Sequence, residues 1–116
     1  MSRDSATLLD MLKAARLAAE FRKGMNKRAF LDDPKTQSAV LHQLLVLGEA
    51  GKRLSQEFRA QHQEVPWKKI VGMRDTLIHE YDDVDLNEVW NTVRSDVPRL
   101  IKLLEPLAPS EEENEP

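Results

Sequence analysis

The chain has 116 residues, 41% hydrophobic and 32% charged, which fits one folded domain and excludes an intrinsically disordered protein. It contains no cysteine, so disulfides and cysteine-based metal sites are excluded. The formal net charge is −3, and four of the 20 acidic residues fall in the last eight positions, so the remaining chain is nearly neutral (17 − 16 = +1). Sequence-independent nucleic-acid binding usually requires a strongly basic face, although a small RNA site needs much less charge.

The first predicted helix covers about residues 4–23, where apolar residues recur at helical spacing. Gly24 stands where a C-terminal cap is expected. The segment lacks the continuous apolar core of a signal peptide, and no apolar run approaches the roughly 20 residues that span a bilayer. We therefore expect a soluble, cytoplasmic protein that does not enter a membrane.

The second predicted helix covers about residues 33–61, with Asp33 as the N-cap and Pro34 in the first helical position. Gly48 and Gly51 lie inside it and reduce helix stability. Glycines there mark either a close crossing with another helix or a point where the helix bends, and the crossing is slightly favoured.

The third predicted helix begins at Pro66 in the first helical position and ends at about His79 or Tyr81. Trp67 is more easily explained as a core aromatic than as a platform for stacked bases.

The fourth predicted helix begins after Asp85, an N-cap that forms a capping box with Glu88. Trp90 belongs to its apolar face and is expected in the core. Pro98 removes a backbone donor inside the helix, which predicts a kink or break near Asp96.

Long helices, short connections and the lack of a strand pattern predict an all-α fold, an antiparallel four-helix bundle. We expect this domain to cover residues 1–108. Residues 109–116 carry four glutamates and no basic residue, which is typical of a disordered acidic tail.

One segment of the third helix carries residues suited to chemistry. If residues 67–84 are treated as a continuous helix, Arg74 and Tyr81 lie one above the other on the edge of the apolar stripe. Asp75 and His79, four residues apart, stack on the polar side.

Arginine binds phosphate through its planar guanidinium group, so Arg74 can hold an RNA phosphate. Histidine exchanges protons near neutral pH, so His79 can deprotonate a ribose 2′-hydroxyl or protonate a leaving 5′-oxygen. Asp75 can orient the imidazole of His79. Tyr81 can bind phosphate through its hydroxyl or stack on a base, although a boundary residue with a wet hydroxyl explains it too.

Val71 and Ile78 fall between the two pairs of polar residues. A groove or a partner surface explains this interleaving, and the plainer alternative is a helix with a wide core stripe. One histidine cannot easily act as both acid and base, whereas two copies of the segment across a two-fold axis supply two. We therefore expect a homodimer.

The segment from Arg74 to Tyr81 resembles the R-x4-H-x-Y motif of HEPN-domain toxins of the HepT type. The resemblance extends to residues 47–55, 65–73 and 84–90, in the order in which the family has them, and covers residues 3–107. The motif alone is a weak signal, whereas the ordered set of segments is a specific one.

The resemblance implies a helical bundle that dimerises, with both copies of the motif facing one cleft. It further implies the toxin of a type VII-like toxin–antitoxin pair, a metal-independent endoribonuclease that acts on RNA rather than DNA and needs no cofactor. Arg74 and His79 correspond to its catalytic pair. The implied partner is an MNT-type nucleotidyltransferase antitoxin, which would attach AMP to Tyr81 and block the cleft with a bulky anion.

Asp75 departs from the family pattern, because many relatives have Asn after the motif arginine. The additional negative charge can weaken RNA binding. Glu49 is the second supporting residue: it either reaches Arg74 from the neighbouring helix or pairs on the surface with Lys52 or Arg53.

The remaining titratable residues have simpler explanations. His42 and His62 lack partners at metal-ligand spacing and are expected at the surface or in structural roles. In the acidic run after the motif, Asp85 is expected to cap a helix and Asp82 and Asp83 to form a turn, so no metal site is predicted.

Two alternatives to a ribonuclease remain at this point. One is a non-catalytic helical subunit that binds the nucleotidyltransferase or presents a substrate to it. The other is a protein that sequesters nucleotides or RNA. The presence of Arg74, His79 and Tyr81 together favours the nuclease, because a pure binding subunit has no evident need for all three.

Overall fold

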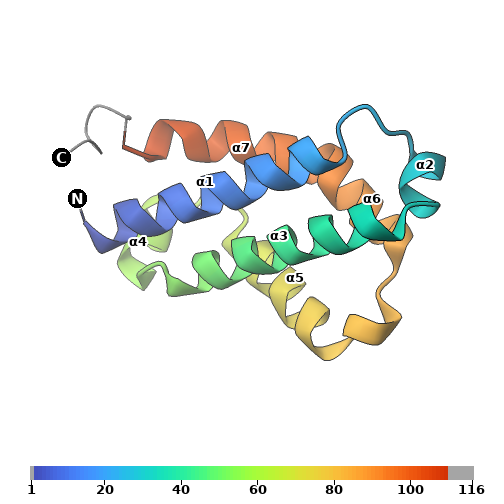
Figure 1. Cartoon of the computed structure of the whole chain (residues 1–116). Coiled ribbons are helices and arrows are strands. Elements are labelled where there is room, and N and C mark those ends of the chain that lie inside the picture. Colours follow the sequence, from blue (N-terminus) through green and yellow to red (C-terminus); the bar gives the residue numbers. More distant parts are fainter. Residues whose placement is uncertain (1, 110–116) are drawn as a thin grey trace.

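The computed structural model describes residues 2–109, and every regular element in that range is helical (Figure 1). The α-helices in chain order are α1 (Arg3–Phe21), α2 (Lys27–Leu31), α3 (Pro34–Arg53), α4 (Gln56–Gln61), α5 (Trp67–His79), α6 (Leu86–Asn91) and α7 (Val97–Leu104). Short 3-10 turns follow α5 (Tyr81–Asp83) and α7 (Glu105–Leu107), and a π-helical turn joins α6 to α7 (Thr92–Asp96). None of the described helices is both long and apolar enough to span a membrane.

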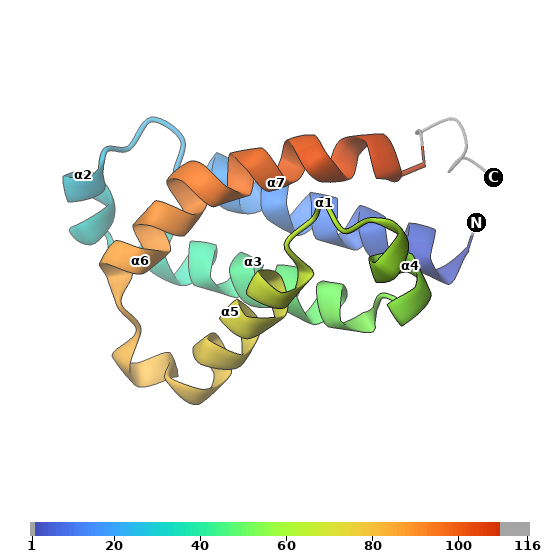
Figure 2. The ribbon, with the colours of Figure 1, turned by 180° about the vertical axis from the view of Figure 1, so that it is seen from behind.

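The long helices form a bundle in which α3 packs against both α1 and α5, and α7 packs along α1. Figures 1 and 2 show α1 running against α3, and α6–α7 returning along α1 as a single rod. The prediction of an all-α helical bundle is confirmed. All of the expected acidic tail except Pro109 lies outside the described residues.

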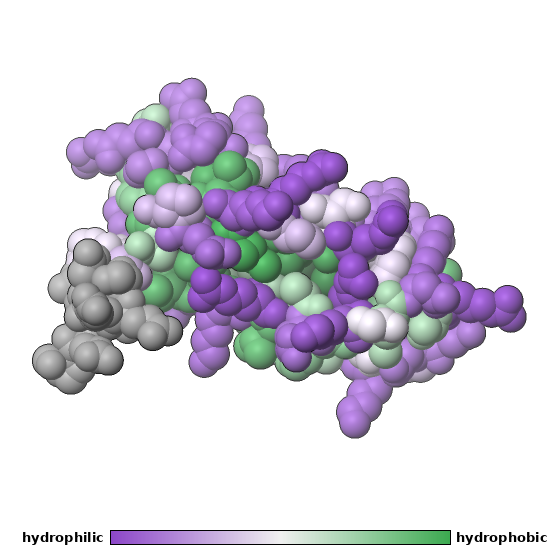
Figure 3. Space-filling view, turned by 90° about the horizontal axis from the view of Figure 1, so that it is seen from above, coloured by the Kyte–Doolittle hydropathy of each residue, from purple (hydrophilic) through white to green (hydrophobic). Residues whose placement is uncertain are grey.

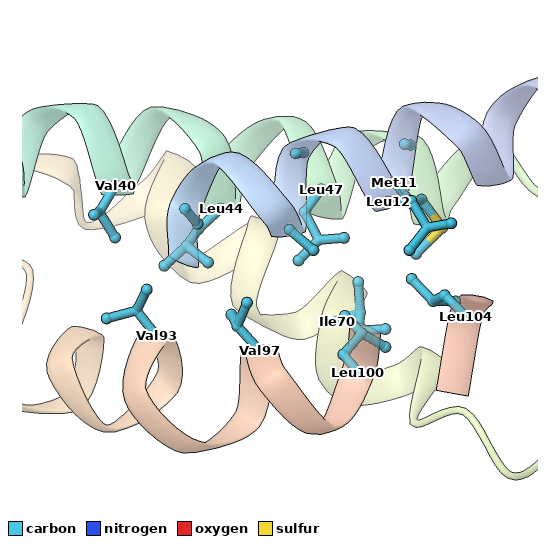
Figure 4. Packing of buried hydrophobic residues seen from close by; sticks show 14 of the residues in the cluster. Met11, Leu12, Val40, Leu44, Leu47, Ile70, Val93, Val97, Leu100 and Leu104 are labelled. Carbon is cyan, nitrogen blue, oxygen red and sulfur yellow. The ribbon is translucent and has the colours of Figure 1, made fainter. Parts of the chain in front are cut away.

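The core lies where these helices face one another, and Figure 4 shows side chains from α1, α3, α5, the π-helical turn and α7 meeting there. It contains Leu8, Met11, Leu12, Val40, Leu44, Leu47, Ile70, Val93, Val97, Leu100 and Leu104, all buried. Trp67 and Trp90 are buried too, as expected. The surface over α1 and α7, seen from above in Figure 3, is mostly hydrophilic, with apolar side chains showing between the charged ones.

Several predicted helix ends are confirmed. The Asp33 carboxylate accepts a hydrogen bond from the Thr36 N–H at 3.2 Å and caps α3, with Pro34 as its first residue. The Asp85 carboxylate accepts one from the Asn87 N–H at 2.9 Å and caps α6. Gly24 takes a left-handed conformation (φ 79°), but the predicted cap at this residue is wrong, because α1 ends at Phe21 and Arg22 is its C-cap.

The second predicted helix, over residues 33–61, is too long, because helix α3 ends at Arg53. Leu54 is extended (ψ 143°), and Ser55 caps the separate helix α4 by accepting from the Phe58 N–H. A residue of α1 stabilises this interruption between α3 and α4. The Ser55 N–H and hydroxyl both donate to the Asp4 carboxylate, at 3.0 and 2.7 Å.

The last helix is irregular near Pro98, as predicted, but it is not interrupted. The chain widens into the π-helical turn just before α7, where the Val97 N–H bonds to the carbonyl of Thr92, five residues back. A π-turn of this kind is one way in which a helix accommodates a residue that cannot donate a backbone hydrogen bond.

The third helix begins one residue later than predicted. Pro66 is its N-cap, and Trp67 is its first helical residue.

Candidate functional site

The site is built on a close crossing of α3 and α5 (Figures 1 and 2). A Cβ atom placed on Gly48 would overlap the Cβ of Arg74 and lie 3.2 Å from its Cα. One turn further, a Cβ on Gly51 would come within 3.1 Å of Cγ2 of Ile70. The two glycines therefore mark a close crossing, as predicted, and the order of the contacts makes the helices antiparallel.

This crossing brings Arg74 within reach of the residue that follows Gly48. The Arg74 Nε–H donates to Oε1 of Glu49, an ion pair between the two helices. The Arg74 side chain is only 20% exposed, so its position is restricted by packing and by this bond. The predicted contact between Glu49 and Arg74 is confirmed, and the alternative pairing of Glu49 with Lys52 or Arg53 is not formed in the described part of the chain.

Asp75 makes a different contact from the one expected. Its Oδ1 accepts a hydrogen bond from Nη1 of Arg74 at 2.8 Å, whereas no hydrogen bond to His79 is formed among the described residues. This bond lowers the pKa of Asp75, and the nearby charges of Lys52 and His79 lower it further. The hydrogen bonds that Arg74 donates to Asp75 and to Glu49 raise the pKa of Arg74. Asp75 therefore bonds directly to Arg74, whereas its interaction with His79 is only a longer-range electrostatic one.

His79 is the last residue of α5 and is exposed. It lies one turn beyond Asp75 on the same face, so Arg74, Asp75 and His79 share one end of α5. An exposed imidazole at a helix end is accessible to a large substrate.

Tyr81 lies outside α5, because the helix ends at His79 and Glu80 leaves the helical conformation (φ −121°, ψ 30°). The assumption of a continuous helix over residues 67–84 is therefore wrong, and so is the stacking of Tyr81 over Arg74 that followed from it. The tyrosine instead begins a 3-10 turn and is 63% exposed.

Tyr81 borders a hollow of about 190 Å³ between α3 and the end of α5. Its lining consists of Leu41, His42, Leu45, Leu77 and Tyr81. His42 is exposed, as expected, and lies on the same side of the molecule as Tyr81. A larger hollow, of about 330 Å³, lies between α5 and α7 and contains none of the motif residues.

Lys52 was predicted only as a possible surface partner of Glu49, and its charge acts on Asp75 within the motif. It lies on α3, three residues after Glu49 and thus on the same face, and its charge lowers the pKa of Asp75. The helical spacing from Glu49 was the available signal. Among the described residues, no three histidine, aspartate or glutamate side chains cluster as a metal site would require.

The family model described as "Ribonuclease HepT-like" matches residues 11–107 of the chain, which includes the α3–α5 crossing and the whole motif. The chain belongs to the HepT-like ribonuclease family. Membership supports ribonuclease activity, with RNA as the substrate, and it confirms the resemblance stated from the sequence.

Curated relatives of this HepT-like chain carry matching names. It is 42% identical over 93 residues to a protein of Thermococcus cleftensis named "Probable ribonuclease HepT", covering 80% of this chain and 84% of that protein. It is 41% identical over 92 residues to a protein of Caldanaerobacter subterraneus named as a "Putative RNase", covering 79% and 82%. A third protein, from Methanocaldococcus jannaschii and also named as a "Putative RNase", is 36% identical over 100 residues, covering 86% of this chain and 92% of that protein. No solved structure gives a significant match.

Proposed function

We propose that this HepT-like protein is a toxin-type endoribonuclease that cleaves RNA without a metal ion, with Arg74 and His79 as its catalytic residues. The observation that carries the proposal is the ion pair with Glu49, which fixes Arg74 on the helix that ends in the accessible imidazole of His79. An arginine held by a second helix is preorganised to bind a phosphate, and the histidine at the end of its own helix can transfer protons.

The reaction needs two proton transfers. The ribose 2′-oxygen loses its proton and attacks the phosphorus, the bond to the 5′-oxygen breaks, and that oxygen takes up a proton. The products are a 2′,3′-cyclic phosphate and a free 5′-hydroxyl. Arg74 stabilises the charge on the phosphate oxygens, and histidine serves as base in one transfer and as acid in the other.

A homodimer supplies the second histidine in this proposal. Ile78 is 43% exposed and Tyr81 63% exposed, both on the motif side of the molecule. Large apolar side chains exposed beside a polar site are typical of a protein interface. If two copies meet over this side, the two His79 side chains face one cleft.

Regulation at Tyr81 is the second part of the proposal. The partner would be a nucleotidyltransferase antitoxin of the MNT type that attaches AMP to the tyrosine hydroxyl. The exposed position of Tyr81, on a separate turn beyond His79, makes its hydroxyl accessible to a second enzyme. The added phosphate would repel RNA from the neighbouring site.

Expression in a host cell tests the proposal as a whole. Wild type should arrest growth and degrade RNA, and the His79→Ala variant, at the same protein level, should do neither. Growth arrest that persists in His79→Ala would overturn the nuclease proposal and favour a binding subunit. Coexpression with a candidate nucleotidyltransferase, followed by peptide mass analysis, should show the addition of AMP at Tyr81.

A further inference from the structure

The charges around Arg74 do not suit phosphate binding as they stand. Two carboxylates share one guanidinium group: Glu49 accepts from Nε and Asp75 from Nη1, at 2.8 Å. Both arginine contacts that the described residues provide are therefore to anions. An RNA phosphate that arrives at this arginine meets a guanidinium group already bonded to two carboxylates.

The two carboxylates differ in role. Glu49 comes from α3, across the helix crossing, and its side chain is 39% exposed. Asp75 comes from α5 itself, next to Arg74, and its side chain is 51% exposed. Glu49 therefore fixes Arg74 to α3. Asp75 instead accepts a hydrogen bond from the outer end of the guanidinium group. In other proteins this end of arginine often forms two parallel hydrogen bonds with a phosphate.

Asp75 also lies where several positive groups converge. Apart from its bond with Arg74, its pKa is lowered by the charges of Lys52 on α3 and His79 one turn along α5. Arg74 is bonded to Asp75, Lys52 lies across the helix crossing on α3, and His79 lies one turn further along α5. An arginine, a lysine and a histidine are groups that can assist the cleavage of a phosphodiester.

We propose that the Asp75 carboxylate is an internal stand-in for the substrate phosphate: it occupies the anion position at the outer end of Arg74 in the free protein, and RNA binds by displacing it, with its phosphate then held by Arg74 and Lys52. The inference rests on the proposed function and deepens it by assigning Lys52 to the phosphate site. Displacement requires a rotation of the short Asp75 side chain, which is 51% exposed and can turn toward solvent while Arg74 stays bonded to Glu49.

Binding of an RNA that cannot be cleaved tests this directly. A fluorescent oligonucleotide with 2′-O-methyl groups has no free 2′-hydroxyl, so its dissociation constant can be measured by anisotropy without turnover. Asp75→Asn keeps an oxygen that can accept from Arg74 but removes the charge. It should bind about tenfold more tightly than wild type, as expected when one close like charge is removed.

Two further variants separate this effect from a general change in charge or a positioning role. Asp83→Asn, an exposed acidic residue in the turn after α5, should change affinity less than about twofold. Asp75→Ala should also bind more tightly than wild type, whereas a residue that only positions Arg74 would give weaker binding when truncated. Lys52→Ala should weaken binding about tenfold in the Asp75→Asn background.

Equal or weaker binding by Asp75→Asn, in a variant with an unchanged circular dichroism spectrum, would overturn the inference. So would an equal gain from Asp83→Asn. The inference and the proposed function fail separately. If wild type cleaves RNA but Asp75→Asn binds no more tightly, only the stand-in is wrong. If Asp75→Asn binds more tightly but no variant cleaves RNA, only the nuclease is wrong.

Discussion

Gly48 on α3 lies directly against Arg74 on α5, so close that any side chain at Gly48 would collide with the Cβ of the arginine. The contact explains how a charged residue on the edge of the core is brought beside Glu49 without a gap between the helices. The same glycine therefore sets both the packing of the bundle and the geometry of the site.

Gly48→Ala should destabilise the fold by about 1–3 kcal/mol, because the added methyl group overpacks the α3–α5 crossing. Gly72→Ala is the matched control: it lies inside α5 with nothing within 4 Å of the added atom, and should stabilise the protein by up to about 1 kcal/mol. Urea denaturation measures both. A Gly48→Ala midpoint at or above that of wild type would show that the crossing is not tight.

Glu49→Ala should reduce the rate of RNA cleavage by about 10–100-fold, because the guanidinium of Arg74 then loses its bond to α3 and can shift. Glu49→Gln keeps an oxygen acceptor and should lose less. The measurement is kcat/KM on a short RNA, with Glu57→Ala, an exposed glutamate on α4, as the control. Equal activity in Glu49→Ala and Glu57→Ala would mean that Arg74 needs no anchor.

Asp4 should make the fold sensitive to acid. Its bonds from Ser55 hold its pKa below the ordinary value of 3.8, so the stabilisation is complete above about pH 4 and is lost as pH falls through the lowered pKa. Asp4→Asn should therefore lower Tm at pH 7, and the difference from wild type should shrink below pH 4. A difference in Tm that is the same at pH 7 and pH 3 would rule out the charge as its cause.

Mixed dimers should show whether both histidines are needed. If wild type and His79→Ala subunits are unfolded together, refolded and assort at random in equal amounts, about one quarter of the dimers carry two copies of His79. Cleavage should then fall to about a quarter of that of the same total of wild type. A fall to only one half would indicate that each subunit acts alone.

Local patterns in the sequence were enough for the bundle, most caps and the glycine crossing. Periodic apolar residues, Asp33 and Asp85 as caps, and Gly48 with Gly51 all act within one or two helical turns, so their consequences can be predicted without the rest of the chain.

The errors arose where a distant contact or a weak local signal decides the structure. The break at Leu54 depends on Asp4, 51 residues earlier in the chain than Ser55, and no local pattern reveals that pairing. The short helix α2 was not predicted, although Asn26 caps it by accepting from the Ala29 N–H. The end of α5 at His79 is one of the two predicted ends, but the chain has no proline or glycine to mark it, and the assumed continuous helix over residues 67–84 ran past it.

Within the candidate site, the contacts among the predicted residues were foreseen only in part. The ion pair of Glu49 with Arg74 was one of two alternatives until the crossing was seen. Asp75 was expected to orient His79 but bonds to the adjacent arginine, because neighbours on a helix surface can meet when both side chains are long or bent toward each other. Spacing alone does not choose between these partners.

Cleavage of a short RNA by the purified protein in the presence of EDTA tests the central claim most directly. Wild type should cleave it to products that end in a 2′,3′-cyclic phosphate. The Arg74→Ala and His79→Ala variants should be slower by about 100-fold or more, while His62→Gln, a histidine beyond α4 and away from the motif, should match wild type. Activity that disappears with EDTA, or that survives intact in His79→Ala, would contradict a metal-independent ribonuclease with His79 at its centre.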